Sequence, residues 1–190
     1  MAATTATLPV VGANGDIYVA ALGTPIPAAW DDLDADPWRK VGLISEDGLG
    51  FEPSSDIESI KAWQTLYDVR RLKTSIEATL TFAIMEWNPD NIIFAFGGGS
   101  WTTTGTDPDI MHTYTPPTPD EQAVWAVAAK VLDGPLKLGL YFPQVVVDEL
   151  EEVSFKRDEA ALLSATTGIL GSAELPAWQM FSDDARFATP

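Results

Sequence analysis

Residues 74–85, TSIEATLTFAIM, carry the clearest structural pattern in the chain. The apolar residues on one face are Ile76, Ala78, Leu80, Phe82 and Ile84. The residues between them are Glu77, Thr79, Thr81 and Ala83. An apolar period of two is typical of a β-strand with one buried face. We therefore predict a half-buried strand over residues 74–85.

The sequence Asn88-Pro89-Asp90 ends this strand and begins a helix. Asn is a favoured N-cap, Pro fits the first helical position, and Asp is stabilised near the positive end of the helix dipole. The apolar face would consist of Ile92, Ile93 and Phe96. Gly97 can end the helix, so we expect one short helix here.

The rest of the chain alternates between short apolar runs and turn residues. The runs that predict strands are residues 17–22, 38–44, 111–115, 136–142, 151–156 and 160–170. Asp47-Gly48 and Asp158-Glu159 are expected to form turns. A loop rich in Pro and Asp, residues 25–37, separates the first two runs.

Residues 123–132 fit two structures. Thr118-Pro119-Asp120-Glu121 resembles a capping box, and helical spacing relates Val124, Val127, Ala128 and Val131. A strand is favoured by Asp133-Gly134, which is a typical hairpin turn, and by the alternating apolar run that follows it. We favour a hairpin.

These elements together predict a mostly β protein. The expected architecture is an antiparallel β-sandwich or partly open barrel with one short flanking α-helix. We expect a single domain over residues 1–190. Within it, residues 1–14 would form an N-terminal arm, residues 54–71 a projecting hairpin or loop, and residues 175–190 a C-terminal arm.

The composition limits the classes of partner. The chain has 28 acidic and 11 basic residues and a formal net charge of -17, which opposes binding to nucleic-acid phosphates or to an anionic membrane. It has no cysteine, hence no disulfide or thiolate chemistry. The N-terminus lacks the pattern of a secretory signal, and no apolar run is long enough to predict a membrane span. We expect a soluble protein that is made in a cytoplasm.

No motif predicts an enzyme, a metal site or a cofactor site. His112 is the single histidine, and no G-x-S-x-G motif accompanies it. Asp32, Asp34 and Asp36 have the spacing of a calcium loop, but Pro37 stands where that loop requires Gly. A solvated acidic loop is the simpler interpretation. We therefore predict a protein without catalytic residues or cofactors.

Residues 54–71 are the best candidate for a subunit interface, because large apolar and charged side chains are mixed there without clear periodicity. The candidate interface residues are Asp56, Glu58, Ile60, Lys61, Trp63, Tyr67, Arg70 and Arg71. The alternative is a loop packed on its own domain. Arg70, Arg71 and Lys73 form the only compact basic cluster, which is either a solvent-facing strand or a docking point for an acidic surface of another copy.

Several stretches together resemble one protein family. They are residues 15–19 (GDIYV) with Gly23-Thr24, residues 38–64 (WRKVGLISEDGLGFEPSSDIESIKAWQ), residues 85–88 (MEWN) and residues 155–160 (FKRDEA). In this order the sequence resembles the major tail tube proteins of long-tailed, siphovirus-type bacteriophages, especially those of actinobacterial hosts.

The resemblance implies a structural protein of the virion tail. Such proteins form hexameric rings that stack into a hollow tube. The tape measure protein occupies the lumen, DNA passes through it at ejection, and tail tip and terminator proteins bind the tube ends. In that family a long hairpin reaches the neighbouring ring, and residues 54–71 occupy the matching position. DNA would be non-specific cargo in an acidic lumen, and no membrane partner is expected.

Two other functions compete with this interpretation. One is a tube subunit of a contractile-injection or type VI secretion system, which shares the ring architecture. The other is a monomeric β-sandwich binding module, for instance for carbohydrate, in which Trp30, Trp101 and Trp178 would be stacking platforms. A tube subunit should polymerise, whereas a binding module should remain monomeric.

Overall fold

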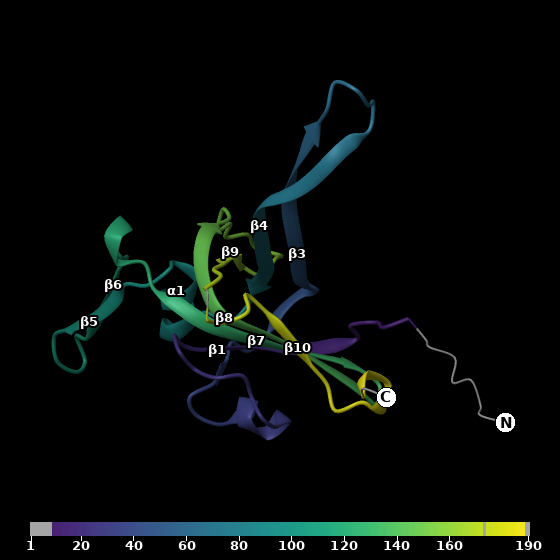
Figure 1. Ribbon diagram of the computed structural model, residues 1–190. Coiled ribbons are helices and arrows are strands. Elements are labelled where there is room, and N and C mark those ends of the chain that lie inside the picture. The colour runs from purple at the N-terminus through teal and green to yellow at the C-terminus, as the bar shows by residue number, and fades with distance from the viewer. Residues whose placement is uncertain (1–8, 173, 189–190) are drawn as a thin grey trace.

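A computed structural model describes residues 9–172 and 174–188 and contains two antiparallel sheets (Figure 1). The strands of the large sheet are β1 (Asn14–Ala21), β2 (Arg39–Lys40), β3 (Ile44–Lys61), β4 (Asp68–Ile84), β7 (Val124–Asp133), β8 (Leu136–Leu150), β9 (Leu163–Ile169) and β10 (Gln179–Phe181). Their order is β2-β1-β7-β8-β9-β4-β3, with β10 beside β8. The small sheet contains β5 (Ser100–Thr104) and β6 (Met111–Thr115). The described residues contain one α-helix, α1 (Pro89–Ala95), and three 3-10 turns at Trp30–Asp34, Pro119–Glu121 and Ala185–Phe187.

The large sheet curls around one apolar core. Strands from both halves of the sheet and helix α1 contribute side chains to this core, among them Val19, Leu80, Phe94, Val127, Phe142 and Leu163. Strands distant in the order share a core only if the sheet bends, so its two ends approach each other. The pairings recorded for the described residues include none between the end strands β2 and β3, and an open hollow of about 770 Å³ lies beside β1 and the start of β3. The prediction of a mostly β, antiparallel fold with one flanking helix is confirmed.

A second, smaller cluster covers the opposite face of β1 and β7. The loop between β1 and β2 contributes Leu33 and Trp38, which pack on the sheet residues Tyr18 and Tyr141. The Tyr18 hydroxyl donates a hydrogen bond to the Asp34 carboxylate at 3.0 Å. Burial raises the pKa of Tyr18, and the hydrogen bond to Asp34 raises it further, so this phenol remains a donor. The Asp34 carboxylate thus helps to fix the loop between β1 and β2 on the large sheet.

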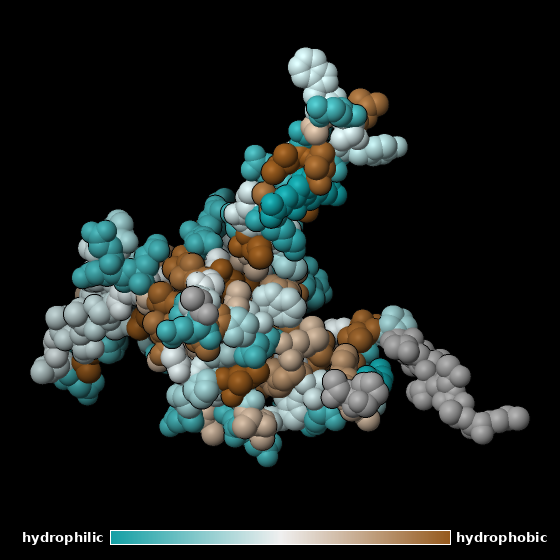
Figure 2. Space-filling model, viewed as in Figure 1, coloured by the Kyte–Doolittle hydropathy of each residue, from teal (hydrophilic) through white to brown (hydrophobic). Residues whose placement is uncertain are grey.

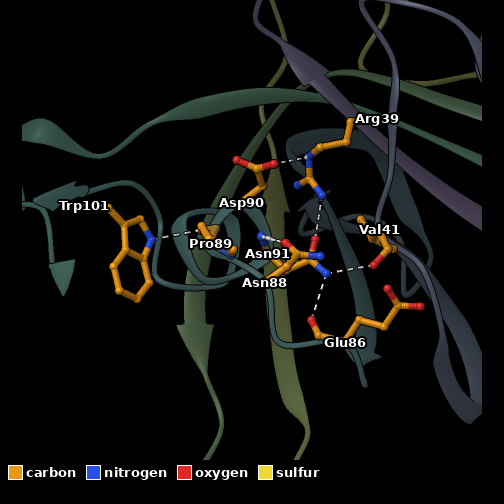
Figure 3. Close-up of polar contacts among 8 residues, drawn as sticks. All are labelled: Arg39, Val41, Glu86, Asn88, Pro89, Asp90, Asn91 and Trp101. Carbon is orange, nitrogen blue, oxygen red and sulfur yellow. Dashed lines mark hydrogen bonds and ion pairs between the residues drawn. The ribbon is translucent and has the colours of Figure 1, made fainter. Parts of the chain in front are cut away.

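Helix α1 is fixed by a polar cluster at its N-terminus (Figure 3). The side chain of Asn88 caps the helix by accepting a hydrogen bond from the Asn91 backbone N–H at 2.8 Å. Asn91 is fully buried, and its amide donates to the backbone oxygens of Val41 (2.8 Å) and Glu86 (2.9 Å). The Arg39 guanidinium donates to the Asn91 side-chain oxygen at 2.6 Å. This one asparagine therefore joins the helix to the segment that follows β2 and to the segment between β4 and the helix.

Two predicted features in the first half of the chain are wrong. Asp47-Gly48 is not a turn between strands, because β3 continues through it and pairs with β4 on both sides. Ile44 lies opposite Ile84 and Leu49 opposite Phe82, so the additional residues of β3 form an irregular bulge. The strand expected over residues 38–44 is only the two-residue β2, which pairs with β1 at two positions.

The strand expected over residues 151–156 is also wrong, although the chain bends at residues 157–159, where a turn is predicted. The backbone N–H of Glu151 donates a hydrogen bond to the backbone oxygen of Ser164 at 2.9 Å. Residues 151–162 form no strand. Strand β9 already pairs with β8 on one edge and β4 on the other, so it offers no further edge. The expected strand over residues 160–170 is present as the shorter β9.

Residues 124–132 belong to β7, as the favoured hairpin interpretation predicts. The capping signal before them forms only the 3-10 turn Pro119–Glu121. At the C-terminus, β10 pairs with residues 139–141 of β8, so residues 179–181 lie on the sheet. The N-terminal stretch expected as an arm lies largely outside the described residues, although the Val11 N–H donates to Asp133 at 3.0 Å. No helix of the described residues is long and apolar enough to cross a membrane.

Candidate assembly surfaces

The outer half of the β3–β4 hairpin extends well beyond the rest of the sheet (Figure 1). Strand β9 pairs with β4 only over residues 79–84, whereas β3 and β4 pair with each other as far as Lys61 and Asp68. In the described part of the chain, residues 54–77 therefore form a two-stranded ribbon. A strand rises about 3.3 Å per residue, so the ribbon projects roughly 30 Å.

All eight candidate interface residues lie on this ribbon or at its tip, and every one of them is exposed. The tip is strongly apolar: Trp63 and Leu66 are each 100% exposed, and Tyr67 is 84% exposed. Figure 2 shows apolar residues along the same projection, mixed with hydrophilic ones. Side chains of this size are rarely left fully in water, and contiguous exposed apolar patches mark interaction sites. The ribbon is thus an accessible surface and does not pack on its own domain.

The basic cluster of Arg70, Arg71 and Lys73 is divided between the two faces of the ribbon. Arg70 lies opposite Ile60, while Arg71 lies opposite Ser59 and Lys73 opposite Ile57. Because side chains alternate along a strand, Arg71 and Lys73 share one face and Arg70 lies on the other. Arg71 also forms an exposed ion pair with Asp68 at 3.6 Å.

The edges of the large sheet form a second accessible surface. Strand β2 pairs with β1 only at Tyr18 and Val19, and Val41 donates one further hydrogen bond to Ile17. The start of β1, from Asn14, pairs with β7 on its other side. β3 is the terminal strand at the opposite end of the order. Unpaired strand edges are templates for pairing with another chain.

The sequence did not predict a second projection, which consists of residues 98–122 (Figure 1). It contains β5 and β6, and a hydrogen bond from the Ala123 N–H to the Gly97 oxygen (2.8 Å) closes its base. Gly97, Gly98 and Gly99 all have positive φ, a region that other residues rarely adopt. Three consecutive glycines after a helix were the signal for this abrupt change of direction.

An aromatic cluster holds the base of this second hairpin on helix α1. Trp101 packs on Tyr114 with ring centroids 5.3 Å apart, and Tyr114 packs on Phe96 at 5.6 Å. The Trp101 indole N–H donates to the Pro89 oxygen at 3.2 Å (Figure 3). The tip of the hairpin, by contrast, exposes Ile110 and Met111.

The three tryptophans expected as stacking platforms for a ligand have partners within the chain. Trp101 belongs to the cluster just described. Trp30 packs on Phe181 at 5.0 Å between ring centroids, and Trp178 packs on Phe51 at 5.2 Å. Trp30 and Trp178 thus join the C-terminal segment to the body.

The titratable side chains do not converge on a reaction centre. His112 is exposed and forms a hydrogen bond with Thr103 at 2.9 Å. Asp32 accepts hydrogen bonds from the Ala28 and Ala29 backbone N–H groups, which closes the acidic loop. Among residues 9–172 and 174–188, no group of three His, Asp or Glu side chains could hold a metal ion. The features that stand out among the described residues are the exposed apolar tips of the two hairpins and the edges of the large sheet.

A curled antiparallel sheet with open edges and a long apolar-tipped hairpin defines a class of β protein suited to contacts between subunits. Comparisons with known proteins specify the class further. The family model described as "Phage tail tube protein" matches residues 1–190. The chain therefore belongs to the phage tail tube protein family, a structural component of the virion tail.

The fold also has a counterpart among solved structures. A chain of the "Cryo-EM structure of the anti-feeding prophage (AFP) baseplate, 6-fold symmetrised" is similar, with a TM-score of 0.51 and 9% sequence identity. The match covers 92% of this chain and 97% of that chain. At this identity the likeness concerns the fold. No curated protein sequence matches the chain.

Proposed function

We propose that this protein forms the wall of a hollow phage tail tube by assembling with copies of itself into stacked hexameric rings. The observation that carries the proposal is the long ribbon with its fully exposed Trp63 and Leu66. Its tip lies too far from the core to be covered by its own domain. A neighbouring subunit in the next ring is the partner that would bury it.

The open sheet edges support closure of a ring. In a ring, β3 of one subunit would face the β1–β2 edge of the next, and their backbone groups would pair. Such a contact joins two different patches and is heterologous, so it closes into a ring when the rotation per subunit divides the full circle. The structural neighbour comes from a six-fold symmetrised assembly, which favours six subunits.

The charge of the chain suits a conduit for DNA. A net charge of -17 gives the assembled wall a negative potential, which repels phosphates and lets DNA slide without binding. Genomic DNA would be non-specific cargo at ejection, and the tape measure protein would occupy the lumen before that. Tail tip and terminator proteins would bind the two ends of the tube. The subunit would be made in the host cytoplasm and act without cofactor or catalysis.

A tube of a contractile system is the second candidate, because the fold is similar to that of a chain in the anti-feeding prophage baseplate. A contractile tube differs in binding a sheath on its outer surface. Co-sedimentation of assembled tubes with a sheath protein from the same genome would support that candidate.

Electron microscopy of the purified protein at high concentration tests the main proposal. We expect hollow tubes or six-fold rings in negative stain. A protein that remains monomeric by analytical ultracentrifugation over the same concentrations would contradict self-assembly. That result would favour the monomeric binding module, and a glycan screen would be the next experiment.

A further inference from the structure

We propose that the two projecting hairpins bind each other between copies of the chain: the β3–β4 ribbon of one subunit docks on the tip of the β5–β6 hairpin of another. The pairing rests on the proposed self-assembly and specifies its partner surface. The two hairpins leave the body in different directions, and their tips are far apart within one chain (Figure 1). A contact between them must therefore join two molecules.

Charge complementarity is the first argument. Residues 61–73, the outer part of the ribbon, contain four of the chain's 11 basic residues and one acidic residue, Asp68, so this part carries a net positive charge in an acidic protein. By contrast, the sequence contains no Lys or Arg from residue 74 to residue 129, a segment that includes the whole of the β5–β6 hairpin. Asp107 and Asp109 are at its tip and are exposed. Opposite potentials guide two surfaces into register and oppose wrong pairings.

The distribution of apolar side chains is the second argument. On the ribbon, the exposed Trp63, Leu66 and Tyr67 lie at the tip beside the basic residues. On the β5–β6 hairpin, Ile110 and Met111 are 48% and 66% exposed beside the two aspartates. Each surface therefore combines apolar area with a net charge, which is positive on residues 61–73 of the ribbon and negative at the β5–β6 tip. Contact between them would bury the apolar part and pair the charges at its rim.

Another exposed aromatic on an acidic stretch fits less well. Phe155 is 77% exposed and follows the acidic residues Asp148–Glu152, but Lys156 and Arg157 come directly after it. These cations would repel Arg71 and Lys73. The β5–β6 tip has no such repulsive group.

The pairing of two different patches also has a geometric consequence. A ribbon that docks on a different surface of the next copy leaves its own β5–β6 hairpin free for a further copy. Such a heterologous contact extends without closing, which is the symmetry of stacked layers. The sheet edges proposed above would close each ring, and the hairpins would join successive rings.

Charge reversal tests the pairing. We expect Arg71→Glu with Lys73→Glu, and separately Asp107→Lys with Asp109→Lys, to raise the protein concentration needed for tube formation by about tenfold or more. A mixture of the two variants, and a chain that carries all four changes, should restore tubes. Sedimentation and negative-stain microscopy measure this. Thermal unfolding should be unchanged, because all four side chains are exposed.

A control distinguishes the β5–β6 tip from the other acidic surface. Glu151→Lys with Glu152→Lys changes the charge by the same amount on the stretch before Phe155. It should not rescue the ribbon variant. Rescue by this pair and not by the Asp107 and Asp109 variant would overturn the proposed pairing.

Disulfide trapping gives an independent measurement, because the chain contains no cysteine. Tubes assembled from equal amounts of Arg71→Cys and Asp109→Cys chains should yield disulfide-linked dimers on mild oxidation. Tubes that show neither these dimers nor charge-reversal rescue would overturn the hairpin pairing and leave the tube function intact. A wild-type protein that forms no tubes would overturn both.

Discussion

Strand β4 has two halves that lie in opposite environments. In the inner half, Leu80 is fully buried, as are Phe82 and Ile84. In the outer half, Ile76 lies four residues before Leu80 on the same face of the strand and is 73% exposed. The difference shows that a period of two predicts a strand and its apolar face. It does not say whether the covering layer belongs to the same chain.

The largest expected effect separates these two halves directly. Leu80→Ala should lower the free energy of unfolding by about 2–5 kcal/mol, because it leaves a cavity in a closed core. Ile76→Ala, the matched change on the same face, should stay within about 0.5 kcal/mol, because its side chain is already in water. Urea denaturation of the unassembled protein measures both. Equal losses would mean that the outer half is covered within the monomer.

Loss of a polar contact should likewise lower the free energy of unfolding more in the body of the protein than on the ribbon, and by less than Leu80→Ala does. Asn91→Ala removes the donor from the oxygens of Val41 and Glu86 and the acceptor from Arg39, and all of this lies at the buried base of α1. Unsatisfied buried polar groups cost about 1–3 kcal/mol, so we expect a loss of that size in the free energy of unfolding.

The matched polar change on the ribbon is Asp68→Ala. It removes the ion pair with Arg71 and the hydrogen bond from Ser59, both exposed to solvent. Exposed pairs contribute about 0–1 kcal/mol, so denaturation midpoints should barely change. A loss for Asp68→Ala as large as that for Asn91→Ala would break the distinction between base and ribbon.

The sequence predicted the elements that have strong local signals. It failed for strands and turns that depend on pairing with residues far away in the sequence. The alternation at 74–85 and the caps of α1 were sufficient because neighbouring residues determine them. The turn expected at Asp47-Gly48 failed because β4 supplies a partner on both sides of that dipeptide, and no local pattern records this. For the same reason residues 151–156 looked like a strand but found no free edge.

The candidate interface was partly predictable. Mixed apolar and charged residues identified the segment 54–71, and the structure exposes all eight of its chosen residues. The placement of Arg70 opposite Ile60 and of Arg71 opposite Ser59 depends on the register with β3, which sequence does not give. The strand predicted over residues 111–115 is β6, but its partner β5 was missed because the threonine-rich sequence of β5 lacks an apolar face.

The C-terminal segment provides a third comparison, because it is short and near the surface yet packed on the body. Phe181 stacks on Trp30 and lies over Gly139, where any Cβ would clash with its ring. Phe181→Ala should cost about 1–2 kcal/mol, in proportion to a half-buried aromatic side chain. Unfolding curves measure this loss. An unchanged stability would place this segment with the ribbon, as a surface that awaits a partner.

The smallest effect on stability should accompany the strongest effect on assembly. Trp63→Ala removes a side chain that is 100% exposed in the monomer, so the free energy of unfolding should change by less than about 0.5 kcal/mol. If a second subunit buries this indole, the same change removes a large aromatic contact of the kind that dominates interfaces, worth about 2 kcal/mol or more. Tube formation should then require a protein concentration about thirtyfold higher.

Gln64→Ala is the matched control, since Gln64 neighbours Trp63 at the same exposed tip but contributes little apolar area. Circular dichroism follows the folding of both variants, and sedimentation with electron microscopy follows their assembly. Normal tubes from Trp63→Ala would show that the tip is not buried between subunits. A folded Trp63→Ala protein that fails to assemble, beside a normal Gln64→Ala protein, would show that the tip of the β3–β4 ribbon becomes buried only in the assembled tube.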